Sequence, residues 1–294
     1  MINQSIIPCI WFDGDVEQIA EWYVSIFPDS FVDYTTTLTD TPAGETTIVT
    51  LSLAGQFFQL LGAGPLKDRN PSISYMVTFP TTEEVETLWH KLADGADVLM
   101  PLDTYDFSER YGWLKDKYGV SWQIMHSGGM DIQTVTPCFL FVNEVFGQAE
   151  AALNDWVSVF PDSYVLEDQL IRYAVADGPE LEGKLNYARF VLSGREFVAM
   201  DSSANHQFAF NEMQSLIAFC ETQDEIDDYW EKLSAVPEAE QCGWLVDRYG
   251  VSWQIVPWEM EEMMTTGTPE QLARVTEAFL PMKKIDVATL RNVY

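Results

Sequence analysis

The sequence predicts an α+β fold made of two similar modules and a helical tail. The segment VSIFPDSFV at 24–32 recurs as VSVFPDSYV at 157–165. A longer segment, GWLKDKYGVSWQI at 112–124, recurs as GWLVDRYGVSWQI at 243–255. Because landmarks of this kind return in the same order, the two halves are expected to share one fold.

The landmarks place the module boundaries. We expect the first module at residues 1–128, the second at 129–260 and the tail at 261–294. The joint between the modules, HSGGMD at 126–131, is a glycine-rich turn. Insertions differ between the copies, because the first has extra residues at 100–110, and such differences belong in surface loops.

The first half of module one reads as strand, helix and three strands. The apolar residues of 16–27 recur at helical spacing, which predicts an amphipathic helix. Ala54-Gly55 is typical of a tight hairpin turn between two strands. The strands themselves are predicted at 5–12, 31–38, 45–53 and 56–61.

The second half of module one repeats that order. A strand at 72–79 precedes a helix at 82–92, which Thr81 or Thr82 would cap. Further strands are predicted near Val98, at 111–115 and at 120–125, and module two repeats the whole order from 134 to 257.

The tail is predicted to be helical. Thr268 and Pro269 suit the N-cap and first position of a helix. Apolar residues then follow at helical spacing, at Leu272, Val275 and Phe279. Asp286 would cap a second helix over 287–293. We expect the tail to pack on the modules and to carry no chemistry.

Charge and cysteine usage limit the partners. Lys and Arg number 16 against 46 Asp and Glu, a net charge of -30, which repels nucleic acid and anionic membranes. The first residues lack a basic segment followed by an apolar run, so we expect no signal peptide. The four cysteines form no Cys-x-x-Cys pair, and no apolar stretch is long enough to span a membrane. Reduced thiols in a cytoplasmic protein are therefore expected.

The element order and the repeated GVSWQI hairpin resemble the vicinal-oxygen-chelate superfamily, which includes glyoxalases, bleomycin-resistance proteins and dioxygenases. The FPDS and GWLxD motifs, with MKKID at 282–286, resemble its PhnB-like branch, whose members often carry the name 3-demethylubiquinone-9 3-methyltransferase. The resemblance covers nearly the whole chain. It implies two βαβββ units per module, whose curved mixed sheets form a cup for a small ligand. No glycine-rich S-adenosylmethionine loop follows the first strand, so we expect no methyl transfer.

Metal-dependent members of this superfamily place His, Glu or Gln at four cup-facing strand positions. In module one the resemblance carries these positions to Ile7, Gln59, Ser72 or Ser74, and Gln123. In module two it carries them to Val135, Val198, Met213 or Ser215, and Gln254. Neutral amides and hydroxyls are weak ligands for transition metals, and none of the three histidines falls on these positions. We therefore expect neither a metal nor a cofactor.

Several residues are candidates for the ligand site. Gln123 and Gln254 are polar residues in apolar final strands, so each needs a partner, either a ligand or a neighbouring loop. Trp11, Gln59 and Tyr75 would line the cup of module one, unless the two aromatic residues belong to the core.

Strand alternation predicts which way the final strands face. Trp122 and Trp253 are expected in the core beneath helices, so Gln123 would point into the cup of module one and Gln254 into that of module two. Lys115, Asp116, Asp247 and Arg248 are interpreted as turn and surface charges rather than an acid–base pair.

Three functions fit these observations. The first is a metal-independent protein that binds an apolar or aromatic metabolite or drug. The second is an enzyme of the lyase, isomerase or dioxygenase kind, which would use Gln59, Gln123 and a water molecule. The third is a structural or partner-binding protein whose cups are filled by side chains. In each case the modules are expected to pair within the chain as a pseudo-dimer, and a further homodimer is left open. Because Gln59 has Val198 as its counterpart, module one is favoured as the functional cup.

Overall fold

The computed structural model describes residues 2–64, 67, 69–130 and 132–294, so Asp131 of the predicted joint lies outside the described residues. The chain divides into two compact units. Unit 1 comprises Met1–Leu53, Phe57–Lys67 and Asn211–Tyr294, and unit 2 comprises Ala54–Gln56 and Asp68–Phe210. Each unit therefore combines half of module one with half of module two.

Unit 1 is built on a seven-stranded mixed sheet in the order β14-β15-β13-β1-β4-β3-β2. Module one supplies β1 (Ile6–Phe12), α1 (Val16–Ile26), β2 (Phe31–Thr41), β3 (Gly44–Leu53) and β4 (Gln56–Gly62). Module two supplies β13 (Gln214–Cys220), α4 (Gln223–Leu233), η3 (Pro237–Ala239), β14 (Trp244–Val246) and β15 (Ser252–Pro257).

Unit 2 is built on an eight-stranded mixed sheet in the order β10-β11-β12-β9-β5-β8-β7-β6. Module one supplies β5 (Ile73–Phe79), α2 (Thr82–Leu92), β6 (Asp97–Tyr105), β7 (Ser108–Lys115) and β8 (Ser121–His126). Module two supplies β9 (Val135–Phe141), η1 (Asn143–Val145), α3 (Ala149–Val159), β10 (Tyr164–Arg172), η2 (Val175–Asp177), β11 (Leu185–Leu192) and β12 (Arg195–Asp201). The predicted strands and helices of module one agree with these bounds within a few residues.

The two modules pair within the chain through two antiparallel contacts. β1 pairs with β13, with Ile7 opposite Ile217, and β5 pairs with β9, with Tyr75 opposite Pro137. The predicted intrachain pairing is therefore confirmed. The expectation that each module encloses its own cup is wrong, because these pairings join each half-module to a half of the other module.

The repeated GVSWQI hairpin is held by a buried carboxylate. Asp116 Oδ1 accepts the backbone N–H groups of Tyr118 (2.8 Å) and Val120 (3.1 Å), and its Oδ2 accepts Trp122 Nε1–H (2.8 Å). Asp247 makes the same bonds in the second copy, including one from Trp253 at 3.0 Å. Both tryptophans lie in the core, as predicted. The two aspartates belong to turns, as predicted, but are buried rather than surface charges.

The second half of module two differs from the corresponding half of module one. Where module one has strand β6, module two has the short helix η3, and β14 has only three residues. The tail accepts hydrogen bonds from backbone N–H groups just before β14. Cys242 N–H donates to Met282 O (2.6 Å), and Gly243 N–H donates to Lys283 O (2.7 Å). Cys242 has a φ of 54°, which places its side chain in a turn instead of a strand. The extra residues of module one form the β6–β7 hairpin.

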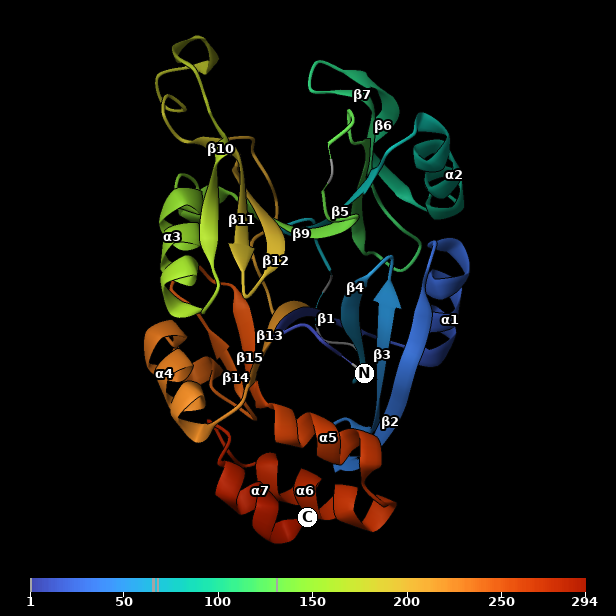
Figure 1. The fold of residues 1–294 in the computed structure, drawn as a ribbon, viewed down its shortest axis with the longest axis vertical. Coiled ribbons are helices and arrows are strands. Elements are labelled where there is room, and N and C mark those ends of the chain that lie inside the picture. The colour runs from blue at the N-terminus through green and yellow to red at the C-terminus, as the bar shows by residue number, and fades with distance from the viewer. Residues whose placement is uncertain (1, 65–66, 68, 131) are drawn as a thin grey trace. The chain divides into compact units, whose positions relative to one another are not determined.

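The tail forms three helices, α5 (Trp258–Thr266), α6 (Pro269–Phe279) and α7 (Val287–Val293). Thr268 caps α6 and Asp286 caps α7, as predicted. The helices gather beside the end of β2 (Figure 1). Their apolar faces bury a cluster that includes Leu38, Met263, Val275, Phe279 and Leu290. Among the described residues, no helix is long and apolar enough to cross a membrane.

Candidate functional site

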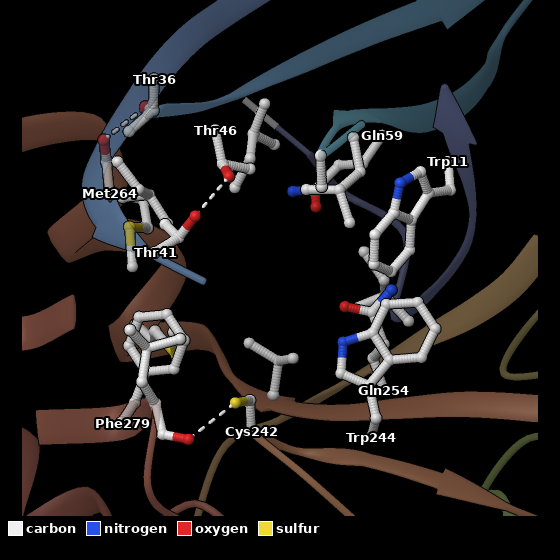
Figure 2. A pocket seen from close by; sticks show the side chains of 18 of the residues that line it. Trp11, Thr36, Thr41, Thr46, Gln59, Cys242, Trp244, Gln254, Met264 and Phe279 are labelled. Carbon is white, nitrogen blue, oxygen red and sulfur yellow. Dashed lines mark hydrogen bonds between the residues drawn. The ribbon is translucent and has the colours of Figure 1, made fainter. Parts of the chain in front are cut away.

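A cavity of about 410 Å³ lies within unit 1. Most of its lining is apolar, with polar groups at a few positions. In the close view, Trp11, Gln59, Trp244 and Gln254 lie along one wall (Figure 2). Thr36, Thr41, Met264 and Phe279 are seen across from them. The cavity is therefore bounded by β1, β4, β14 and β15 on one side and by β2 and the tail on the other.

The first wall is formed by alternate side chains of neighbouring strands. Trp11 on β1, Gln59 on β4 and Gln254 on β15 all face the cavity. The rings of Trp11 and Trp244 lie with centroids 6.1 Å apart at a tilt of 58°. Trp11 Nε1–H donates to Gly64 O at 2.9 Å, which fixes the indole in place. Three of the five predicted ligand residues thus line one cavity.

The tail supplies the second wall. Met260, Glu261 and Met264 of α5 line the cavity, together with Phe279 and Leu280 at the end of α6. Thr36 Oγ1–H on β2 donates to Met264 O at 2.7 Å, which ties α5 to the sheet. The tail packs on the modules as expected, but it also forms part of the candidate site.

A polar cluster forms where the two walls of the cavity meet, from side chains of β2, β4 and α5. Tyr34 on β2 donates its hydroxyl hydrogen to Glu261 Oε1 on α5. Gln59 Nε2 lies 3.2 Å from Glu261 Oε2 and 3.2 Å from the Tyr34 hydroxyl oxygen. Since both neighbours donate, the Glu261 side chain is arranged as a hydrogen-bond acceptor, the role of an ionised carboxylate.

The cluster is electrostatically unusual. Burial raises the pKa of the Glu261 carboxyl, and repulsion from Asp33 raises it further, while the bonds from Tyr34 and Gln59 oppose the shift. Burial, followed by the charge of Glu261, raises the pKa of Tyr34, which stays a neutral donor. No ion pair to Glu261 is found among the described residues. A carboxylate without a cation thus faces a mostly apolar cavity.

The two units share a second arrangement, made of glutamine, serine and cysteine. In unit 1, Gln254 Nε2 donates to Ser215 Oγ at 3.0 Å, and both side chains contact the Cys9 thiol. In unit 2, Gln123 Nε2 donates to Ser74 Oγ at 2.8 Å and lies 3.6 Å from Cys138 Sγ. Gln254 and Gln123 thus lie on the opposite face from their neighbouring tryptophans, as alternation predicts.

This donor set does not fit a divalent transition metal. Around the inner face of unit 1, the strand positions hold Cys9, Gln59, Ser215 and Gln254, which offer a thiol, two amides and a hydroxyl. Metals bind the thiolate, yet burial raises the pKa of the Cys9 thiol to about 11 and that of Cys138 to about 12. Over the described part of the chain, no three His, Cys, Asp or Glu side chains gather as a metal-binding group.

The other two predicted site residues belong to unit 2 and do not line this cavity. Gln123 is buried, and its Oε1 accepts the Tyr111 hydroxyl hydrogen at 2.8 Å. For Tyr75 the sequence leaves open a place in the cup or in the core, and the structure shows the core. Its ring is buried and packs on Trp122 with ring centroids 5.3 Å apart, on the face opposite Ser74 and Gln123. Because β5 and β8 belong to unit 2, the set predicted for one cup is divided between the units.

Tyr111→Phe is expected to lower the free energy of unfolding of unit 2 by about 1–2 kcal/mol, because Gln123 Oε1 would lose its buried donor. Thermal unfolding followed by circular dichroism measures the change. Tyr105→Phe is the control, because that hydroxyl bonds to Pro101 O at an exposed site. Equal effects of the two variants would contradict a structural role for the Tyr111 bond.

Sequence reasoning missed Tyr34, Trp244 and Glu261. Tyr34 follows an irregularity in the pairing of β2 with β3, between Val32 and Tyr34, which changes the face that simple alternation assigns. Glu261 lies in the tail, beyond the repeat. Glu261 shares its helix face with Trp258 and Met264, three residues before and after it, and this place in an apolar stripe was the available signal.

Comparisons with known proteins agree with the fold. The family described as 3-demethylubiquinone-9 3-methyltransferase matches residues 4–125 and again 133–256. No curated protein matches the chain. A PhnB protein from Bacillus cereus is 35% identical, covering 42% of this chain and 100% of its own, with a TM-score of 0.39.

Glyoxalases resemble the chain more distantly. Glyoxalase I from Zea mays covers 90% of this chain and 98% of its own, with a TM-score of 0.57 at 9% identity, which shows a common fold alone. A glyoxalase-related enzyme from Fulvimarina pelagi is 18% identical over 46% of this chain and 98% of its own, with a TM-score of 0.33. The family matches span most of both modules. The chain therefore belongs to the PhnB-like family described as 3-demethylubiquinone-9 3-methyltransferase, as two tandem copies on the glyoxalase-like vicinal-oxygen-chelate fold.

Proposed function

We propose that the protein binds an apolar or aromatic small molecule in the cavity of unit 1, without a metal. The observation that carries this proposal is the cavity itself, about 410 Å³ with a mainly apolar lining and a few convergent polar groups. Small-molecule sites commonly have roughly 300–1,000 Å³ and this kind of lining. Gln59 and Gln254, with Glu261, would orient the polar end of the ligand.

Unit 2 has a different inner face. Tyr111 stands where unit 1 has Cys242, since each residue precedes the repeated Gly-Trp pair. The Tyr111 ring is buried and bonded to Gln123, whereas Cys242 is half-buried on the cavity wall. Arg189, buried and paired with Glu196, also approaches Cys138 in unit 2. These contacts favour a structural role for unit 2, because its side chains fill the space that a ligand would take in unit 1.

An enzyme is the second candidate. A carboxyl on a cavity wall can act as a general base or acid, and Glu261 lies on this wall half-buried, with a pKa that burial raises. Proton abstraction from a bound substrate, as in an isomerase or lyase, would need the same cavity. Methyl transfer, which the family's description names, has no support in the sequence, because no glycine-rich S-adenosylmethionine loop follows the first strand.

Titration calorimetry with 1-naphthylmethanol, a neutral aromatic probe, tests the binding proposal. Native mass spectrometry of gently purified protein is expected to detect one small organic molecule per chain. After refolding without that molecule, the protein is expected to bind one probe per chain saturably. Absence of binding by 1-naphthylmethanol and by its amine and carboxylate analogues, together with a ligand-free mass spectrum, would overturn the proposal. Turnover of a ligand identified by mass spectrometry would favour the enzyme.

A further inference from the structure

We propose that the ligand of unit 1 carries a cationic amine, which binds against the carboxylate of Glu261. This inference rests on the proposed function and names the chemical class of its ligand. A neutral aromatic body would occupy the apolar part of the cavity, and its ammonium group would reach the cluster of Tyr34, Gln59 and Glu261 on the wall.

The hydrogen bonds of Glu261 leave room for another donor. A carboxylate has about four acceptor sites, and Tyr34 and Gln59 use one on each oxygen. An ammonium group has three N–H donors and no acceptor, so it matches the remaining sites. A carboxylate on the ligand would instead meet Glu261 with like charge and no donor to spare.

The cavity has no cation of its own to balance Glu261 among the described residues. The other acidic residue of the wall, Glu212, is paired with Lys67 at 2.7 Å. On α5 itself, Glu259 is paired with Arg291 at 2.7 Å. The charged group that acts on Glu261 is Asp33, which is also acidic. Glu261 is half-buried, and a charge removed from water even in part gains from a partner of opposite sign, which here the ligand would supply.

The aromatic residues favour the same class of ligand. Trp11 and Trp244 line the wall beside Gln59 and Gln254 (Figure 2). Indole faces attract cations and also stack on aromatic bodies. The net charge of -30 raises the local concentration of cationic molecules, although it does not select this cavity.

Three probes with the same aromatic body separate the possibilities: 1-naphthylmethylamine, 1-naphthylmethanol and 1-naphthoate. In calorimetry near neutral pH with physiological salt, we expect the dissociation constant of the amine to be at least about tenfold lower than that of the alcohol. The naphthoate is expected to bind more weakly than either. Because the ionised carboxylate is the binding form, the preference for the amine should grow as the pH rises through the pKa of Glu261. Asp33 and Tyr34 from β2 are the other titratable groups of this cluster.

Two matched variants assign the preference to one residue. Glu261→Gln keeps the size and is expected to reduce the amine preference to about twofold or less, because the variant loses far more affinity for the amine than for the alcohol. Glu262→Gln removes the same charge from the next, exposed position of α5 and should leave the preference intact. Equal binding of amine and alcohol by the natural protein would overturn the inference and leave the proposed function standing. A preference that survives Glu261→Gln would also overturn it. Binding of none of the probes would instead contradict the proposed function.

Discussion

Replacing Asp116 with alanine is expected to lower the free energy of unfolding of unit 2 by about 4 kcal/mol. The buried carboxylate accepts two backbone N–H groups of the turn and Trp122 Nε1–H. Alanine would leave all three donors without this acceptor, and each bond to a charged group contributes roughly 1.5–3 kcal/mol. Part of the loss would be recovered by water that enters the turn.

Urea unfolding measures this change, with far-ultraviolet circular dichroism as the signal. Because the chain has two compact units, the unfolding curve is to be fitted with two transitions. Asp94→Ala removes an exposed carboxylate from unit 2 and should change its stability by a few tenths of a kcal/mol. Asp247→Ala is expected to give a loss like that of Asp116→Ala, but in unit 1. A loss below about 1 kcal/mol in both aspartate variants would show that the turn does not depend on this carboxylate.

Val256→Trp is expected to weaken binding of 1-naphthylmethanol at least about 100-fold, or roughly 2.7 kcal/mol. Val256 lies on β15, half-buried on the cavity wall. An indole at this position would project into the cavity and occupy much of the space that the probe needs. Calorimetry on the natural protein and the variant gives the comparison.

The control is Val98→Trp, an equal change at an exposed position of β6 in unit 2, where Val98 is 46% exposed. It should leave the affinity within about twofold, a difference of roughly 0.4 kcal/mol. Circular dichroism checks that both variants keep the native fold. If folded Val256→Trp binds the probe as the natural protein does, the probe occupies another site.

Short sequence patterns were enough to predict most of the helices and strands. Turn residues such as Ala54-Gly55 and caps such as Thr268 act within a few residues of chain, so the element bounds could be predicted closely. Alternation around Trp122 and Trp253 also predicted which way the neighbouring glutamines face. These features depend on sequence spacing alone.

The make-up of the site depends on contacts far apart in the chain. Gln59 and Gln254 share a cavity because β1 pairs with β13, a choice that similar repeats leave open. Gln123 falls in unit 2 for the same reason, since β5 pairs with β9. Glu261 reaches the cavity because α5, which follows β15 directly, packs on β2, where Thr36 Oγ1–H donates to Met264 O. No local pattern encodes these long-range pairings.

The most direct test of the account is a crystal structure of the protein with 1-naphthylmethanol bound. The account predicts one probe molecule in unit 1, with its rings between the wall of Trp11 and Trp244 and the helix α5, and its hydroxyl toward Gln59, Gln254 or Glu261. A probe bound in unit 2, or on the surface with the cavity of unit 1 left to solvent, would contradict the account.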